Sequence, residues 1–368
     1  MYRIVTVFSL GLLIVLGAFA VRVNTTEPVL PETHLNYANI ELPAHLQRPA
    51  NRLADNTPSD NRITDAGATL GRVLFYDKRL SRNQTTACGS CHLQEHGFAD
   101  TTAFSTGFEG ELTDRNAMSL SFARFYTNGR FFWDERAETL EAQTLMPIQD
   151  PVEMGMTLDE VVERLEATTF YAGLFEDAFG TPEITPDRMS KALAQFIRSI
   201  VAPNSKFDQG RILQGGGRPG SEPLPNFTDS ENRGMELFFG VARCSECHSG
   251  DMMAPDRVFS NGLDRFPEDQ GAGFGRFKAN SLRNIELTAP YMHDGRFNTL
   301  EEVVNHYDRE IRPHSALFVG LRSQEGGGPI RLNLSEYDRQ ALVDFLKTLT
   351  DTTLATDERW SNPFPEEG

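Results

Sequence analysis

Cysteine and positive charge are both scarce in this 368-residue sequence, and long apolar runs are confined to its first residues. With 35 Lys and Arg against 52 Asp and Glu, the formal net charge is −17, which excludes the basic surface that nucleic-acid binding requires. Four cysteines are too few for a disulfide-stapled small domain, and the lack of repeated apolar runs excludes a polytopic membrane protein. The remaining composition, 39% hydrophobic and 24% charged, is that of a folded globular protein.

The first 26 residues have the pattern of a secretory signal. A single cation, Arg3, precedes an apolar run from Ile4 to Ala20, and no acidic residue occurs before Glu27. The small residues Ala18 and Ala20 offer a cleavage site. At about 1.5 Å per residue the run falls slightly short of a bilayer core of roughly 30 Å, so an uncleaved membrane anchor is the strained alternative. Either outcome predicts an exported, periplasmic protein.

Helical periodicity dominates the rest of the chain. Residues 157–180 carry apolar side chains at mostly helical spacing and end on a glycine, and Thr185 with Pro186 marks the start of a second helix. A short helix is predicted at 229–239, and Ser335 is predicted to cap a further one. No alternating strand pattern stands out. We therefore expect a mainly α fold with long loops.

Composition changes divide the chain into six parts. Residues before about 62 are rich in Pro, Asn, Thr and Ala without a period, so they predict an extended arm whose His34 and His45 lie at the surface. The glycines and prolines of 210–225 suit a linker. The predicted parts are a signal or anchor at 1–26, the arm at 27–62, an N-terminal domain at 63–205, a linker at 206–226, a C-terminal domain at 227–350 and a tail at 351–368.

All four cysteines fall into two copies of one motif. Residues 88–92 (CGSCH) and 244–248 (CSECH) both match Cys-x-x-Cys-His, the attachment sequence of c-type haem. A redox dithiol would not require the histidine, and a zinc site shared by both motifs would need closely coupled segments. We therefore predict two covalently bound haems. The predicted haem-binding residues are Cys88, Cys91 and His92 in the first motif and Cys244, Cys247 and His248 in the second.

Further motifs surround the haem sequences. Residues 70–77 (LGRVLFYD) precede the first one, residues 132–137 (FWDERA) follow it, and SLRN at 281–284 and LTAPY at 287–291 follow the second. Together they resemble the bacterial di-haem cytochrome c peroxidase family, including its MauG-like branch, over roughly residues 63–350. The resemblance implies two cytochrome c-like haem domains packed face to face. The first would hold the peroxide-binding haem and the second an electron-transfer haem.

The resemblance also implies catalytic residues. Trp133 matches the family's tryptophan between the haems, Gln143 its distal glutamine and Glu153 its catalytic glutamate. Peroxide needs a base that takes a proton from one oxygen and returns it to the other, and a partly desolvated carboxylate can do both. Taken singly, Glu153 would be a solvated surface acid and Trp133 a core aromatic. Their joint spacing favours the catalytic assignment.

A cation site is implied by the same resemblance. The family's inter-domain calcium site is similar to Asn116 together with the carbonyl groups of Thr288 and Pro290. Oxygen ligands with few formal charges suit a hard cation whose shell is completed by water. We therefore expect Ca²⁺ between the domains.

Two positions depart from the peroxidase pattern. Some family members carry a histidine downstream of the first haem motif that plugs the peroxide site; here residues 106–109 (TGFE) contain none, and only His96 is nearby. We expect the first haem to be open at rest. Tyr307 stands where the peroxidases have a methionine ligand to the second haem, as in the MauG-like branch. Phenolate favours higher oxidation states. His306 could compete for this iron, and a core tyrosine is the alternative.

Three functions remain in competition. The leading hypothesis is an oxidoreductase that reduces hydrogen peroxide to water with electrons from a small redox protein, a cytochrome c or a cupredoxin. The acidic surface would attract a basic donor at low salt. A MauG-like enzyme that oxidises residues of a partner protein is favoured by Tyr307, but Ala242 stands where MauG has a surface tryptophan. A non-catalytic di-haem electron carrier would need two six-coordinate irons. Monomer and homodimer both stay open.

Overall fold

The computed structural model describes residues 26–254, 257–324 and 326–365. The prediction of a mainly helical protein is confirmed, since the sheet in this part of the chain pairs just two strands of 2 residues each. None of the helices described is both long and apolar enough to cross a membrane. The predicted signal or anchor at 1–26 lies outside the described residues except for Thr26. The elements are α1 (Pro49–Leu53), α2 (Asp65–Tyr76), α3 (Cys88–Cys91), α4 (Leu140–Gln149), α5 (Leu158–Glu166), α6 (Tyr171–Phe179), α7 (Pro186–Ser199), α8 (Lys206–Gln214), α9 (Asp229–Phe239), α10 (Leu300–Asn305), α11 (Glu336–Lys347), β1 (Val258–Phe259) and β2 (Phe277–Lys278).

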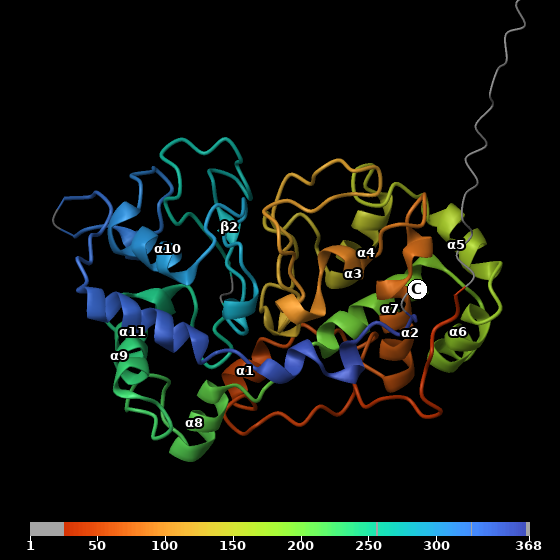
Figure 1. The fold of residues 1–368 in the computed structure, drawn as a ribbon, viewed down its shortest axis with the longest axis horizontal. Coiled ribbons are helices and arrows are strands. Elements are labelled where there is room, and N and C mark those ends of the chain that lie inside the picture. Colours follow the sequence, from red (N-terminus) through yellow and green to blue (C-terminus); the bar gives the residue numbers. More distant parts are fainter. Residues whose placement is uncertain (1–25, 255–256, 325, 366–368) are drawn as a thin grey trace, which may run out of the picture.

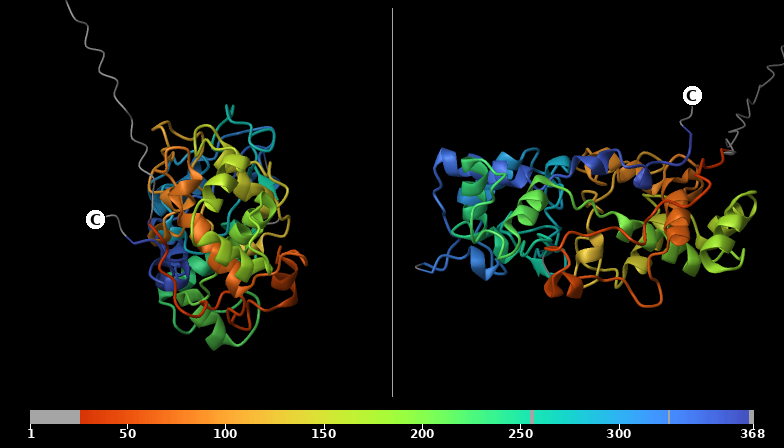
Figure 2. Two further views of the ribbon diagram at one scale, coloured as in Figure 1. Left: turned by 90° about the vertical axis from the view of Figure 1, so that its right-hand side faces the viewer. Right: turned by 90° about the horizontal axis from the view of Figure 1, so that it is seen from below.

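Two lobes lie side by side along the long axis of the molecule (Figure 1, Figure 2). The first lobe contains α2 to α7, and the second contains α9 to α11 with the β1–β2 pair. Each lobe encloses its own cluster of buried apolar side chains. Removing apolar surface from water contributes about 25 cal/mol per Å², so each lobe has its own source of stability.

One closely packed helix pair occupies the centre of each lobe. In the first lobe, a Cβ added to Gly71 of α2 would stand 2.0 Å from the carbonyl oxygen of Ala192 in α7. In the second lobe, a Cβ added to Gly234 of α9 would stand 1.8 Å from the carbonyl oxygen of Ala341 in α11. Both distances are shorter than van der Waals contact. Only glycine therefore allows these helices to approach so closely.

Three predicted helices are present, whereas three other segments differ from their predictions. Helices α7, α9 and α11 begin as predicted, with Thr185 and Ser335 accepting hydrogen bonds as N-caps of α7 and α11. Residues 157–180 form α5 and α6 rather than one continuous helix. The region predicted as a linker contains α8, whose N-cap Ser205 exchanges hydrogen bonds with Asp208. The arm, predicted as extended, includes α1.

The arm and the tail both pack against the first lobe. Tyr37 from the arm and Trp360 from the tail are fully buried in the first lobe's apolar cluster. The Tyr37 hydroxyl donates to the Arg359 carbonyl at 2.7 Å, and the Val29 amide donates to the Pro363 carbonyl at 2.8 Å. After α11 the chain leaves the second lobe and returns along the first (Figure 2). Segments from both ends of the described chain thus complete one core.

A buried ionic cluster joins the arm, α8 and the second lobe. Asp208 of α8 contacts His45 Nε2 at 2.8 Å and accepts a hydrogen bond from Arg283 at 2.7 Å. All three side chains are buried. The expectation that His45 lies at the surface is therefore wrong, because its imidazole pairs with an interior carboxylate. Nearby charge and hydrogen bonds hold the pKa of Asp208 well below its usual range against the opposing effect of burial.

Candidate functional site

The first Cys-x-x-Cys-His motif lies beside a cavity in the first lobe. Helix α3 carries both cysteines, and His92 follows as its C-terminal cap. The His92 Nδ1–H donates to the Phe98 carbonyl at 2.9 Å, which assigns the lone pair of the neutral ring to Nε2. Burial lowers the pKa of His92, so the imidazole is neutral and able to bind a metal. Cys88, Cys91 and His92 all line the cavity.

Glu153 reaches the same cavity from the turn after α4. The Asp150 carboxylate accepts hydrogen bonds from the amides of Val152 at 2.8 Å and Glu153 at 3.2 Å, which fixes the turn. The Glu153 carbonyl in turn accepts from the Phe108 amide. Burial and then the neighbouring Asp150 charge raise the pKa of Glu153 to about 7. A carboxyl group with this pKa can both accept and donate a proton near neutrality.

Gln143 brings an amide to this cavity from α4. Gln143 and Pro147 are one helical turn apart on α4, and both line the cavity together with Glu153. His96, the histidine considered as a plug, lies on the turn after the motif and is absent from the lining. Among the described residues that line this cavity, His92 is the sole histidine. The structure therefore brings the two predicted distal residues into the cavity of His92, and no second imidazole lines that cavity among the described residues.

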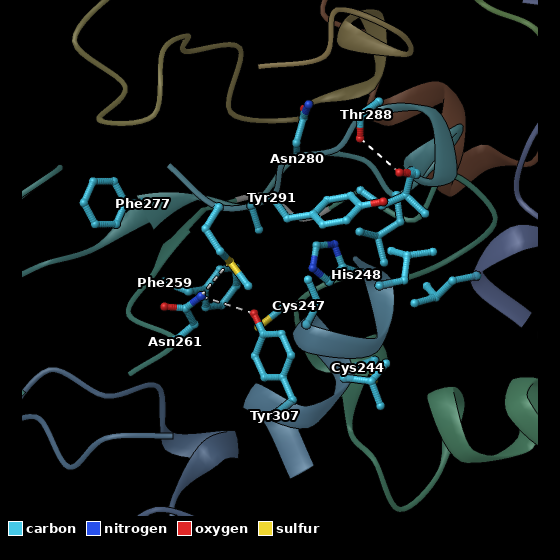
Figure 3. A pocket seen from close by; sticks show the side chains of 18 of the residues that line it. Cys244, Cys247, His248, Phe259, Asn261, Phe277, Asn280, Thr288, Tyr291 and Tyr307 are labelled. Atoms are coloured by element: carbon cyan, nitrogen blue, oxygen red, sulfur yellow. Dashed lines mark hydrogen bonds between the residues drawn. The ribbon is translucent and has the colours of Figure 1, made fainter. Parts of the chain in front are cut away.

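The second Cys-x-x-Cys-His motif lines a larger cavity in the second lobe (Figure 3). Cys244, Cys247 and His248 form one wall, and Tyr307 points toward them. Burial lowers the pKa of His248 to about 4, which keeps this imidazole neutral as well. The rest of the lining is mainly apolar, as a flat aromatic macrocycle would require.

Tyr307 owes its position to a π-helical turn, residues 306–310, that directly follows α10. Such turns are frequent at functional sites because they rotate one side chain out of helical register. The Tyr307 hydroxyl accepts a hydrogen bond from Asn261 Nδ2 at 3.3 Å, and burial raises the pKa of this phenol. His306 instead directs Nε2 to the Asn261 carbonyl at 3.1 Å and is absent from the lining. The geometry therefore favours Tyr307 over His306.

Met292 is a cavity residue that sequence reasoning missed. Its sulfur accepts from the same Asn261 amide nitrogen at 3.4 Å, so Met292 and Tyr307 approach one side of the cavity together. A thioether is a common axial ligand of haem iron. The sequence did place this methionine directly after the LTAPY motif, but the resemblance assigned no role to it.

Trp133 lies at the boundary between the lobes. Its indole Nε1–H donates to the Asn116 carbonyl at 2.8 Å, and its ring meets the His293 ring edge-on with centroids 6.4 Å apart. The residue belongs to the first lobe's chain segment but lines the second lobe's cavity. This placement is consistent with the prediction that Trp133 lies between the two haem sites.

The three residues predicted to bind calcium line the second cavity together. Asn116 comes from the first lobe, and Thr288 and Pro290 come from the second. The Asn116 side-chain amide donates to the Thr102 carbonyl at 3.1 Å. In the described part of the chain, no group of three or more His, Cys, Asp or Glu side chains is arranged to hold a metal ion. A cation here would thus rest on neutral oxygen ligands.

Both cavities fit a covalently held haem. Each offers two unpaired thiols and a neutral histidine on one wall, and each is lined mainly by apolar side chains. Burial raises the pKa of Cys88 and of Cys244 to about 12, so neither thiol is poised as a thiolate for dithiol exchange. Two such centres in one helical chain define a di-haem c-type cytochrome.

Comparison with known proteins gives the family. The sequence model of the family described as di-haem cytochrome c peroxidase matches residues 65–215. Over 303 residues the chain is 35% identical to the methylamine utilization protein MauG of Methylorubrum extorquens, a match that covers 79% of this chain and 80% of that protein. Over 298 residues it is 33% identical to the cytochrome c551 peroxidase of Nitrosomonas europaea, covering 77% and 79%. The chain belongs to the di-haem cytochrome c peroxidase family and is an oxidoreductase of that class.

A solved structure supports the same assignment. A MauG-like protein associated with microbial copper homeostasis matches with a TM-score of 0.74 at 34% identity, over 88% of this chain and 99% of that one. The similarity extends through both lobes. The resemblance inferred from the motifs is therefore confirmed at the level of the family.

Proposed function

We propose that this chain reduces hydrogen peroxide to water with electrons from a small redox protein. The observation that carries the proposal is Glu153, whose pKa is raised to about 7 in a cavity that also holds Gln143 and His92. A surface acid would not be desolvated in this way, and an electron carrier would not need a proton relay. We assign the peroxide site to an N-terminal haem domain at 63–205.

Bound in this cavity through Cys88, Cys91 and His92, a c-type haem would supply an open iron position and redox capacity. Gln143 orients the peroxide by hydrogen bonds to its oxygens. The Glu153 carboxylate takes the proton of the inner oxygen and returns it to the outer oxygen, which leaves as water. Apolar neighbours such as Leu193 exclude bulk water from the proton transfer.

Electrons would enter through the C-terminal haem domain at 227–350. Cys244, Cys247 and His248 would hold the second haem, Tyr307 would supply a further ligand to its iron, and Trp133 would connect the two centres. Calcium bound by Asn116, Thr288 and Pro290 would brace the boundary beside Trp133. The formal charge of −17 suits a basic cytochrome c or cupredoxin donor, and the apolar N-terminal run suits a periplasmic location.

A MauG-like activity on a partner protein is the second candidate. Tyr307 in the second cavity favours it, because a phenolate ligand stabilises stored oxidising equivalents. Ala242 argues against the same route for the substrate, since this residue is buried and presents no aromatic side chain at the surface.

Glu153→Gln in the haem-loaded protein tests the proposal. The variant keeps both haems and loses about 10²- to 10⁴-fold in peroxide turnover, because the amide cannot carry the proton. Peroxide turnover is followed with a reduced cytochrome c, and haem content by absorption. Undiminished turnover would refute the role of Glu153. Electron paramagnetic resonance of the resting protein separates the classes, since two low-spin six-coordinate haems would eliminate both enzymatic readings.

A further inference from the structure

A tyrosine, a glutamate and a lysine form a cluster at the boundary between the lobes. The Tyr126 hydroxyl donates a hydrogen bond to Glu135 Oε1, and Lys278 Nζ stands 3.9 Å from the centre of the Tyr126 ring. Tyr126 and Lys278 are both 3% exposed. Lys278 belongs to β2 of the second lobe, whereas the other two come from loops of the first. None of the three has a part in the proposed peroxide chemistry.

Glu135 is held in place as a proton acceptor. Its backbone has φ 56°, a left-handed conformation that a residue with a side chain adopts only at a cost. In this conformation one carboxylate oxygen receives the Tyr126 hydroxyl and the other receives the Asn128 amide at 2.8 Å. Asn128 is exposed, so a proton that reaches Glu135 is close to solvent.

The buried lysine restricts how Tyr126 can lose an electron. Lys278 Nζ also lies 4.4 Å from the Phe131 ring centre, so its head group is enclosed by aromatic rings. In its protonated form, Lys278 opposes a second positive charge on the tyrosine ring. Loss of an electron from Tyr126 is therefore favoured together with loss of the phenolic proton, because the oxidised ring then stays neutral. Burial lowers the pKa of Lys278 to about 7, which is consistent with this crowded environment.

The cluster is directly connected to Trp133. The Lys278 amide donates to the Trp133 carbonyl at 2.7 Å, and Glu135 is two residues further along the same loop. Trp133 and Lys278 both line the cavity of the second Cys-x-x-Cys-His motif. We infer that Tyr126 is a redox-active residue that stores an oxidising equivalent received by way of Trp133, with Glu135 as its proton acceptor.

The oxidation of Tyr126 rests on the proposed peroxidase function, which supplies the oxidant. Tyr126 gives one electron to an oxidising equivalent derived from peroxide, and its proton moves along the existing hydrogen bond to Glu135. The products are a neutral tyrosyl radical and a protonated carboxyl group. An electron from the donor protein and the proton from Glu135 later restore the phenol.

Rapid-freeze electron paramagnetic resonance tests the inference. The haem-loaded protein, made with ring-deuterated or unlabelled tyrosine, is mixed with peroxide without donor. The wild type is expected to give a radical signal whose hyperfine splitting collapses on deuteration. Tyr126→Phe removes this signal, and Glu135→Gln, which keeps an acceptor oxygen but not a base, slows its appearance at least about tenfold. A purely structural hydrogen bond would leave the signal unchanged in Glu135→Gln.

Tyr76→Phe is the matched control. Tyr76 is partly buried, but its hydroxyl donates to the Trp360 carbonyl at 2.6 Å, which cannot take the proton. Its replacement leaves the radical intact. Loss of the signal in Tyr76→Phe, or its persistence in Tyr126→Phe, overturns the inference.

Peroxide consumption in the same samples separates this inference from the proposed function. If the wild type consumes peroxide and Tyr126→Phe still gives the unaltered radical, the inference is rejected and the proposed function stands. If the wild type consumes no peroxide, the proposed function fails, and a photo-oxidised ruthenium complex replaces peroxide as the oxidant. Under that oxidant the inference still requires a Tyr126 radical that depends on Glu135.

Discussion

Burial of a single carboxyl group sets the pH range in which the first cavity can act. The folded-state pKa of Glu153, about 7, lies above the ordinary carboxyl value, and only the ionised form can take a proton from peroxide. Turnover should therefore rise about tenfold per pH unit below pH 7 and level off above it. The measurement is kcat/KM for peroxide against pH with a donor in excess. A flat profile between pH 5 and 8 would contradict Glu153 as the base.

The same pKa predicts the stability of the Glu153→Gln variant. A raised carboxyl pKa means that the folded protein binds more protons than the unfolded chain, so ionisation costs stability as pH rises toward 7. The amide avoids this cost. Thermal unfolding of the haem-loaded protein above pH 7 should show the variant to be at least as stable as the wild type. Lower stability there would mean that lost turnover reflects damage to the fold.

Tyr307→Phe tests the ligand of the second haem. Removing the phenol oxygen should change the charge-transfer bands and spin state of that haem, because iron would lose its sixth ligand or take another. Met292→Leu is the control, since Met292 shares Asn261 with Tyr307 but is not the assigned ligand. Absorption and electron paramagnetic resonance spectra of the ferric protein show which substitution changes the ligand of the second haem. A spectrum altered by Met292→Leu and unchanged by Tyr307→Phe would reverse the assignment.

For individual residues, the sequence predicted the candidate site best where residue type and spacing together form a motif. The first haem motif, and the family resemblance that assigned Gln143 and Glu153, identified groups that the structure brings into one cavity. The contacts of Met292 and Lys278 could not be predicted. These contacts form because the fold brings together segments that are distant in the sequence. Neither a methionine nor a lysine indicates by its type which residues it will contact.

Two glycines fix the spacing of the central helices. Gly71→Ala and Gly234→Ala should each destabilise the haem-loaded protein by about 1–3 kcal/mol or more, because the new Cβ would meet a backbone carbonyl that cannot move aside. Gly173→Ala is the matched control. Gly173 lies in α6 with nothing within 4 Å of an added Cβ, so alanine there should stabilise by about 0.5–1 kcal/mol. Equal effects at all three positions in thermal unfolding would reject close packing as the cause.

Capping signals predicted helix starts better than periodicity predicted helix continuity. Thr185 and Ser335 act as N-caps as predicted, because a cap needs only its own neighbours. The break between α5 and α6 was hidden, since apolar residues continue through it. The π turn at Tyr307 has no sequence signature, because tertiary contacts decide it.

One buried carboxylate connects parts of the whole molecule. Asp208→Asn should cost about 3–5 kcal/mol, because it leaves Arg283 and His45 facing an uncharged group in the interior. Asp338→Asn provides the comparison. Asp338 pairs with Arg233 at the surface at 2.8 Å, so its loss should cost less than about 1 kcal/mol. Urea unfolding of both variants checks this, and similar midpoints would show that the Asp208 cluster is not a structural centre.

Long-range organisation was the least predictable from sequence. Composition suggested an extended arm rich in Pro, Asn, Thr and Ala and a linker rich in Gly and Pro, and the residues after 350 were expected to form a tail. In the structure, Tyr37 and Trp360 enter the first lobe's core and α8 carries Asp208. A few buried residues in a polar segment leave almost no periodic signal.

The return of the tail constrains the order in which the protein can fold. Because Leu354 and Trp360 complete the first lobe's core, that lobe stays unfinished until the last part of the chain has been made. Folding of each domain as it emerges from the ribosome, the usual order for a chain of two lobes, is thus incomplete for the first lobe. The first Cys-x-x-Cys-His motif, whose Cys88 packs against that core, is therefore synthesised long before the core can close.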